Sequence, residues 1–353
     1  MLESRLKKVR ASMKTMGIDQ LLVTSPQNLQ YLTDTQVNAL DRLNALILGQ
    51  ERAVLVCYML ARVEAEGMET VIYEDSEKTA EALSPYLEPG SIGVDGSMAS
   101  RFLLPLQALR PDLRFTYAKC VESARCIKDA EEVRCLRHAS EVTDEVFAMA
   151  FAQMREGMTE LDMGAVFSDC FARLGAGRFP GDPMVAMGSG TADVHHVPGY
   201  AKLKKGDPVM VDTGKQIGGY YSDMTRTVFF GEPTEEMRRV YDVVLRANQE
   251  AMAVIRPGIT LRSVHDIATR IIREAGYGAY FGHRTSHGIG IDFHEEPFDT
   301  DSHTVVLEPG MCFSVEPGIY LPGKFGVRIE DLVAVTEDGF ELLSHMDRSL
   351  TVL

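Results

Sequence analysis

Residues 209–230 read VMVDTGKQIGGYYSDMTRTVFF, and this stretch predicts a β-hairpin that carries an acid on each strand. The apolar run before Asp212 is typical of a strand, and the pair Gly218-Gly219 is typical of a tight turn; the chain then returns through β-branched and aromatic residues. Asp212 and Asp223 lie symmetrically about a point just before Gly218. We therefore expect these two acids to face each other across the hairpin, with Cβ atoms about 5 Å apart.

A second stretch, residues 314–331, reads SVEPGIYLPGKFGVRIED and repeats this arrangement. Glu316 and Glu330 are symmetric about Gly323, which lies in the turn between two short apolar runs. Two hairpins thus each bring two acids face to face, and we expect all four carboxylates to point into one cleft. Because side chains alternate along a strand, the opposite and buried face is expected to carry Val209, Val211, Val327 and Ile329.

The two hairpins belong to a longer internal repeat. The motif REGMT at 155–159 returns as RPGIT at 256–260, and HHVP at 195–198 returns as HEEP at 294–297, with offsets between 99 and 104 residues across the repeat. The threonine that ends each first motif can cap the helix that follows it. We therefore expect two similar α+β halves related by a pseudo-twofold axis, with a site between them.

Four carboxylates in one cleft repel each other strongly, and divalent cations would relieve that repulsion. The segment HRTSHGIG at 283–290 supplies a neutral donor, His287, next to two glycines that permit close approach of the backbone. Four carboxylates and one imidazole suit a pair of divalent metals, and such a pair can activate water for hydrolysis. The predicted metal ligands are Asp212, Asp223, His287, Glu316 and Glu330.

Further candidates follow from the repeat and from strand alternation. His195 and His294 occupy equivalent places in the two halves, which indicates proton transfer and hydrogen bonding to a substrate carbonyl. Arg328 lies two residues before Glu330 on the same strand face, where it could orient a metal-binding carboxylate or bind a substrate carboxylate. Arg226 should point to the other face and serve the structure.

The N-terminal third of the chain has a different pattern. Short apolar runs alternate with helical patterns, which predicts an α/β domain, and no glycine-rich phosphate loop follows any of the runs. The strands are expected at 20–23, 45–48, 53–57, 70–73 and 91–94, with a helix at 76–86. A capped helix begins after Asp129, and we place the domain boundary shortly before it, giving domains 1–122 and 123–353.

Bulk properties exclude several classes of protein. A net charge of -15 over 353 residues argues against a nucleic-acid partner, which needs a basic face. The N-terminus predicts an amphipathic helix rather than a signal peptide, and no run approaches the roughly 18 apolar residues of a membrane span. The six cysteines include no C-x-x-C pair, which favours free thiols in a reducing cytoplasm.

Taken together, these motifs resemble the pita-bread metallopeptidases, and within them Xaa-Pro dipeptidase (prolidase) and Xaa-Pro aminopeptidase (aminopeptidase P). The motifs that carry the resemblance are VDTG (211–214), YSDMTRT (221–227), HRTSHGIG (283–290), SVEPGIY (314–320) and GVRIED (326–331). The resemblance is close over residues 125–350, and the N-terminal part is more loosely similar to a creatinase-like domain. It implies an α/β creatinase-like N-terminal domain followed by an α+β pita-bread catalytic domain.

The resemblance also implies roles for individual residues. A dinuclear centre, most often manganese and otherwise cobalt, zinc or iron, would be held by the five ligands named above, with Glu316 also acting as proton shuttle. His195 and His294 fall where such enzymes contact substrate and stabilise the tetrahedral intermediate. His283 and Arg328 fall near the residue on the leaving-group side. A homodimer is expected, because family members commonly dimerise.

One departure from the family pattern concerns peptide length. Many prolidases carry arginine directly after the His-Glu-x-Pro run, where it helps to hold the carboxylate of a dipeptide, whereas this chain has Phe298. We expect hydrolysis of small peptides with proline in the second position, and Phe298 leaves room for peptides longer than two residues. The alternatives are a metal-dependent hydrolase of a non-prolyl C–N bond and a non-catalytic binding protein on the same fold. Absence of bound metal would favour the latter.

Overall fold

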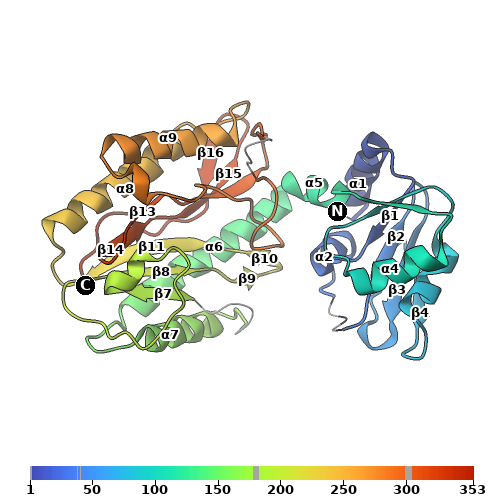
Figure 1. Cartoon of the computed structure of the whole chain (residues 1–353), viewed down its shortest axis with the longest axis horizontal. Helices are drawn as coiled ribbons and strands as arrows, with labels where there is room; N and C mark the ends of the chain where they lie inside the picture. The colour runs from blue at the N-terminus through green and yellow to red at the C-terminus, as the bar shows by residue number, and fades with distance from the viewer. Residues whose placement is uncertain (1, 38, 40, 178–182, 299–303) are drawn as a thin grey trace. The chain divides into compact units, whose positions relative to one another are not determined.

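The computed structural model describes residues 2–37, 39, 41–177, 183–298 and 304–353, and the chain forms two compact units, Met1–Arg125 and Cys126–Leu353 (Figure 1). The short helix α5 (Cys120–Cys126) lies at the division between them. The domain boundary expected after residue 122 falls within α5 and stays a prediction. Among the described residues, no helix is long and apolar enough to cross a membrane.

The first unit contains a six-stranded mixed sheet in the order β4-β3-β2-β1-β5-β6. Its strands are β1 (Gln20–Val23), β2 (Ala45–Leu48), β3 (Ala53–Tyr58), β4 (Glu69–Tyr73), β5 (Ser91–Val94) and β6 (Arg114–Tyr117). The five strands expected from the sequence are confirmed to within a residue, and β6 is an additional edge strand. The helices of this unit before α5 are α1 (Leu2–Met16), α2 (Pro26–Thr33), α3 (Thr79–Leu83) and α4 (Ser100–Leu109), with the 3-10 turn η1 (Met59–Ala61).

The helix expected at 76–86 is shorter in the structure. It consists of α3 followed by the 3-10 helix η2 (Ser84–Tyr86), which has Pro85 in its first turn. Proline has no N–H to donate to the preceding turn, so an α-helix cannot continue through this position without losing a hydrogen bond. Leu83 at the end of α3 packs with Leu106 of α4 and with buried strand residues such as Ile47 and Val54 in the core of this unit.

The second unit is built from two sets of helices and strands that follow each other in the chain. The first set is α6 (Ala130–Phe151), α7 (Glu160–Arg173), β7 (Met184–Met187), η3 (Gly188–Ala192), β8 (Asp207–Thr213), β9 (Gln216–Ile217), β10 (Tyr220–Tyr221) and β11 (Met224–Phe230). The second set is α8 (Glu235–Ala253), α9 (Leu261–Glu274), η4 (Gly278–Tyr280), β12 (Cys312–Val315), β13 (Gly318–Leu321), β14 (Phe325–Arg328), β15 (Asp331–Val335) and β16 (Phe340–Leu342). The larger sheets are β11-β8-β7 and β12-β15-β16.

The predicted repeat is visible in equivalent hydrogen bonds of the two halves. Gly157 N donates to Leu203 O, and Gly258 N donates to Leu307 O, both at 2.9 Å. In each case the glycine has a positive φ, near 84° and 86°, which a residue with a side chain rarely adopts. The same local turn therefore holds the segment before β8 against the start of α7 in the first half, and the segment before β12 against the start of α9 in the second half.

Helix caps follow the same duplication. The side chain of Thr159 accepts a hydrogen bond from Asp162 N, and that of Thr260 accepts one from Ser263 N, so both predicted caps are confirmed. Asp129 forms a complete capping box with Glu132 at the start of α6, also as predicted. The apolar face of the hairpins is fully buried, since no surface is exposed on Val209, Val211, Val327 or Ile329.

Candidate metal centre and active site

The first hairpin forms as expected, but its register differs from the prediction. In the antiparallel pair β8–β11, Asp212 lies opposite Thr225, and Asp223 lies just before β11 begins. The reason is that the turn is formed by Gly218 and Gly219 together, which moves its centre by one residue and the pairing by two. Because a shift of two residues leaves every side chain on the same face, Asp212 and Asp223 still point to the same side, as diagonal neighbours.

The second hairpin has the predicted register. The last pair of the β12–β15 ladder is Val315 with Asp331, and the same alignment resumes in β13–β14. Glu316 and Glu330 are the next pair after Val315 and Asp331, at the point where one ladder ends and the other has not yet begun. Carboxylate oxygens of Asp212, Asp223 and Glu330 lie within 4.8 Å of one another, so the acids from both hairpins converge.

His287 completes the cluster. Its Nε2 lies 3.4 Å from Asp223 Oδ2, 3.6 Å from Glu316 Oε1 and 3.9 Å from Glu330 Oε1. Its Nδ1 lies 3.1 Å from the carbonyl oxygen of Gly288, which can only accept a hydrogen bond. The proton is therefore placed on Nδ1, and the lone pair of Nε2 faces the carboxylates, which is the tautomer that a metal ligand requires.

These acids are buried close to one another, so a nearby positive charge would stabilise their ionised forms. Burial raises the pKa of Asp223 well above its ordinary value, and Asp212 and Glu316 raise it further. Burial likewise raises the pKa of Glu330, with Asp223 as the next cause. Asp223 Oδ1 is buried and makes no hydrogen bond. An acceptor left in this way fits a divalent cation, so the five predicted residues have the chemistry and the placement to hold metal.

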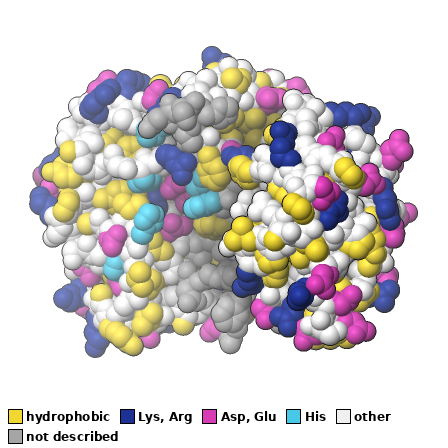
Figure 2. Space-filling view, turned by 45° about the vertical axis from the view of Figure 1, so that its right-hand side comes forward, with side chains coloured by type: hydrophobic (Ala, Val, Ile, Leu, Met, Phe, Trp, Pro, Cys, Tyr) yellow, Lys and Arg dark blue, Asp and Glu magenta, His cyan; other side chains and the backbone are white. Residues whose placement is uncertain are grey.

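A cavity of about 370 Å³ opens onto this cluster. It is lined by all nine residues predicted for the site, and also by Val194, Arg284, Ser286 and Phe293, which sequence reasoning did not single out. Figure 2 shows histidine side chains gathered around acidic ones on one face of the molecule. The predicted acids and the histidines from both halves of the repeat thus line one open cavity.

The two histidines predicted to contact substrate lie at this cavity. The His294 ring lies 4.0 Å from that of His287, measured between centroids, and burial lowers the pKa of His294 to about 4, with His287 as a further cause. His294 is therefore neutral at pH 7 and can donate or accept a hydrogen bond without carrying charge. His195 is exposed at the cavity, and its backbone N–H is held by Asp193 at 3.1 Å.

One wall of the cavity is formed by His283 and Arg328, which a chain of hydrogen bonds links through Tyr320, a residue that does not itself line the cavity. His283 Nδ1 donates to the carbonyl oxygen of Arg284 at 2.8 Å, so Nε2 accepts from the Tyr320 hydroxyl at 2.9 Å. That hydroxyl accepts in turn from Arg328 Nη1 at 2.9 Å, and Arg328 Nη2 donates to Asp212 Oδ2 at 2.6 Å. Of the two roles left open for Arg328, the geometry displays the contact that orients a carboxylate.

Two hydroxyls that the sequence reasoning missed support the acids. The Thr225 hydroxyl donates to Glu330 Oε2 at 2.7 Å and accepts from Arg328 Nε at 3.1 Å. The Ser314 hydroxyl accepts from the backbone N–H of His287 at 3.1 Å and approaches Glu316 Oε1 at 3.5 Å. Thr225 and Ser314 both stand within the motifs quoted above, but only the structure shows which acid each of them contacts.

Known proteins resemble this chain over nearly its whole length. Residues 134–337 match Metallopeptidase family M24, and residues 5–127 match the Creatinase/Prolidase N-terminal domain. The probable dipeptidase PepE of Mycobacterium bovis is 35% identical over 362 residues, covering 99% of this chain and 96% of that protein. A recombinant prolidase from Thermococcus sibiricus has a similar structure, with a TM-score of 0.92, 33% identity and coverage of 100% and 99% of the two chains. A Xaa-Pro dipeptidase from Bacillus anthracis has a TM-score of 0.93 at 29% identity, over the full length of both chains.

Proposed function

The chain belongs to metallopeptidase family M24 and is a peptidase of the prolidase and aminopeptidase P type, and from this premise we propose that it hydrolyses the bond between an N-terminal residue and proline in small peptides. The observation that carries the proposal is the cavity in which the five predicted metal ligands, three further histidines and two arginines meet. Its volume of about 370 Å³ lies near the lower end of the range for small-molecule sites, roughly 300–1,000 Å³, which suits short peptides.

The metal centre is the first part of this proposal. Asp212, Asp223, His287, Glu316 and Glu330 would hold two divalent cations. Manganese is the first choice because the family resemblance implies it and because four of the five ligands are carboxylates, which suit manganese. When bound, such ions polarise a carbonyl and make water a nucleophile at neutral pH. The fit rests on the buried Asp223 oxygen without a hydrogen bond and on the lone pair of His287 that faces the acids.

The protein's own groups would move the proton. Burial raises the pKa of Glu316, although His287 and Arg328 oppose the shift, so its carboxylate can take up a proton more readily than an exposed glutamate. We infer that Glu316 accepts a proton from the attacking water and delivers it to the departing proline nitrogen. Neutral His294, joined by His195, would donate a hydrogen bond to the oxygen on which negative charge develops.

The wall formed by His283 and Arg328 would contact the residue on the leaving-group side. Both side chains are hydrogen-bonded to the Tyr320 hydroxyl at 2.9 Å, which links one to the other. Phe298, which stands where many prolidases have arginine, lies against Arg284, whose guanidinium carbon is 5.5 Å from the centre of the Phe298 ring. Arg284 also lines the cavity, so a cation remains near this position.

We further propose a homodimer located in the cytoplasm. The dimer is proposed because members of the family commonly dimerise, and light scattering on the purified protein would test it. The cytoplasm is consistent with the six cysteines, all of which lie in the described part of the chain and none of which forms a disulfide.

The experiment is hydrolysis by chelator-stripped protein to which manganese has been added. A dipeptide and a tripeptide with proline second would be compared with matched peptides that carry alanine second, and the Glu316→Ala variant serves as control. We expect metal-dependent cleavage confined to the proline peptides. A protein that binds metal and cleaves none of them would refute the prolyl specificity and direct attention to other C–N bonds, while the ratio of dipeptide to tripeptide cleavage reports on Phe298.

A further inference from the structure

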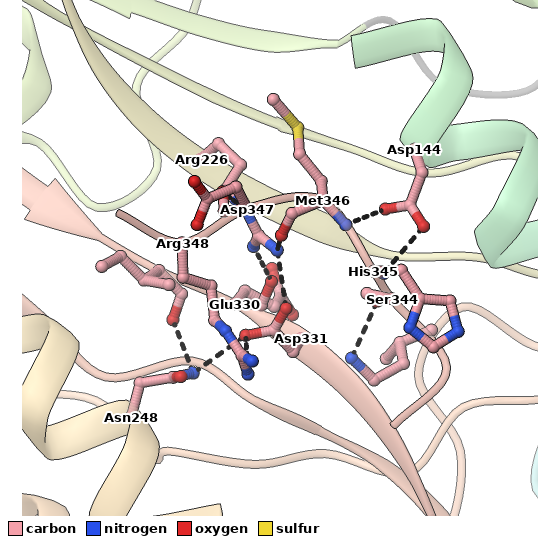
Figure 3. Close-up of polar contacts among 12 residues, drawn as sticks. Asp144, Arg226, Asn248, Glu330, Asp331, Ser344, His345, Met346, Asp347 and Arg348 are labelled. Carbon is pink, nitrogen blue, oxygen red and sulfur yellow. Dashed lines mark hydrogen bonds and ion pairs between the residues drawn. The ribbon is translucent and has the colours of Figure 1, made fainter. Parts of the chain in front are cut away.

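Three buried polar residues form a network behind the acids, and none of them lines the cavity. Arg226 on β11, Asn248 on α8 and Asp331 on β15 are each at most 1% exposed. Figure 3 shows these side chains converging between strands that belong to the two halves of the repeat. The site described above uses none of the three directly, so their burial needs an explanation of its own.

Arg226 is completely satisfied by acceptors. Its five N–H groups donate to Asp347 O at 3.3 Å, Thr225 O at 3.0 Å, Glu330 O at 2.6 Å, Asp331 Oδ1 at 2.7 Å and Met346 O at 2.8 Å. The planar guanidinium therefore fixes the carbonyl of Glu330 relative to β11, the strand that Asp223 precedes. Lysine could not reproduce this, because its single ammonium offers three donors from one point.

Asn248 reaches the peptide units that carry both glutamates. Its Nδ2 lies 3.0 Å from Val315 O and 3.4 Å from Ile329 O, and these residues directly precede Glu316 and Glu330. The same nitrogen lies 3.2 Å from Asp331 Oδ2. The Asn248 amide group thus contacts both backbone segments, the one that leads to Glu316 and the one that leads to Glu330.

We propose that Arg226, Asn248 and Asp331 are positioning residues, which set the separation of Glu316 and Glu330 and their distance from Asp223. They thereby set the affinity of the site for the more weakly bound of its two metal ions. This inference rests on the metal centre of the proposed function. A network needed only for stability could lie anywhere in the core, whereas this one contacts the peptide units next to two of the ligands. Groups that orient metal ligands in this way typically change metal affinity by about 10- to 100-fold when they are lost.

The test uses variants that remove the positioning contacts, with a control from the same region. Asn248→Ala and Arg226→Lys remove contacts to the glutamate-bearing backbone, and Asp331→Asn is a variant of nearly unchanged shape should the others fail to fold. The control is Asp144→Asn, because the Asp144 carboxylate accepts the backbone N–H groups of His345 at 2.7 Å and Met346 at 2.9 Å without touching a ligand peptide (Figure 3).

Manganese stoichiometry and Kd would be measured by calorimetry on stripped protein, together with the melting temperature in chelator. We expect the positioning variants to bind the weaker ion about 10- to 100-fold less tightly, and the control to keep the wild-type Kd within twofold even where it melts earlier. Folded positioning variants with wild-type Kd values for both ions would overturn the inference. Wild-type protein that binds no manganese would overturn the metal centre itself, so the two failures are distinguishable.

Discussion

Replacing Lys128 with methionine should weaken the catalytic unit through a single buried ion pair. Lys128 Nζ lies 2.9 Å from Glu295 Oε1, and the two side chains are only 1% and 7% exposed. Burial is the strongest single influence and lowers the pKa of Lys128, but Glu295 and neighbouring groups together raise the pKa by more. Because Glu295 directly follows His294, this pair also anchors the segment that carries a predicted catalytic histidine.

The size of the effect follows from what methionine keeps and what it removes. Methionine fills much of the space of the lysine stem, so the main loss is the positive charge, and removing one partner of a buried ion pair costs about 3–5 kcal/mol. Glu295 keeps other interactions, among them the hydrogen bond that its Oε2 accepts from Asp292 N at 3.1 Å, which places the expected loss near the lower end of that range. For a unit of this size, 1 kcal/mol shifts Tm by roughly 2–4 °C, so the melting temperature should fall by about 6–12 °C.

A double-mutant cycle would separate charge from packing. Lys128→Met, Glu295→Gln and the double variant would be unfolded in denaturant with manganese held constant. We expect the double variant to recover much of the loss, because glutamine is neutral and can still accept from Asp292. The penalty of Lys128→Met should also shrink as the pH falls, since the Glu295 carboxylate can then be protonated. A loss under about 1 kcal/mol, or strictly additive losses in the double variant, would refute the reasoning.

Three other predictions concern pH and the cavity wall. Burial raises the pKa of Asp223 and Glu330, so the native metal-free protein binds more protons than the unfolded chain. Its stability should therefore fall as the pH rises from about 4 towards the raised pKa values. Melting curves recorded with and without manganese should show this slope only in the metal-free protein. Burial lowers the pKa of His283 to about 4, so this residue contributes stability above its unfolded pKa of about 6.5 that is lost as the pH falls towards 4, and His283→Gln should flatten that part of the profile. Tyr320→Phe removes the hydroxyl between His283 and Arg328 and should lower kcat/KM for a proline dipeptide by about tenfold, whereas a value within twofold of wild type would show that the wall does not depend on it.

Local patterns predicted much of this fold. Apolar runs and turn glycines located both hairpins, and threonine before a helical pattern located the caps at Thr159 and Thr260. These features depend on residues close together in the chain, so the sequence alone determines them. The edge strand β6 was missed because most of its residues are exposed and show no apolar run.

The parts that could not be predicted depend on distances across the chain. The register of the first hairpin depended on which two residues form the turn, and an error of one position there displaced the partner of Asp212 from Asp223 to Thr225. The Tyr320 hydroxyl is hydrogen-bonded to Arg328, 8 residues away in the chain, and to His283, 37 residues away, and no local sequence pattern connects these three residues. Arg226 was correctly expected on the face opposite to the acids, but its contact with the Glu330 backbone, 104 residues on, required the fold.

The duplicated turns at Gly157 and Gly258 have a consequence for how such a site can originate. A chain of half the length of the second unit that paired with a copy of itself about a twofold axis would present the same hairpin twice, and so two acids from each copy, at a shared interface. Symmetry would forbid that ancestor from having one imidazole instead of two. Joining the copies into one chain removes this restriction, so His287 could arise in the second half alone and make the two sides of the centre chemically distinct.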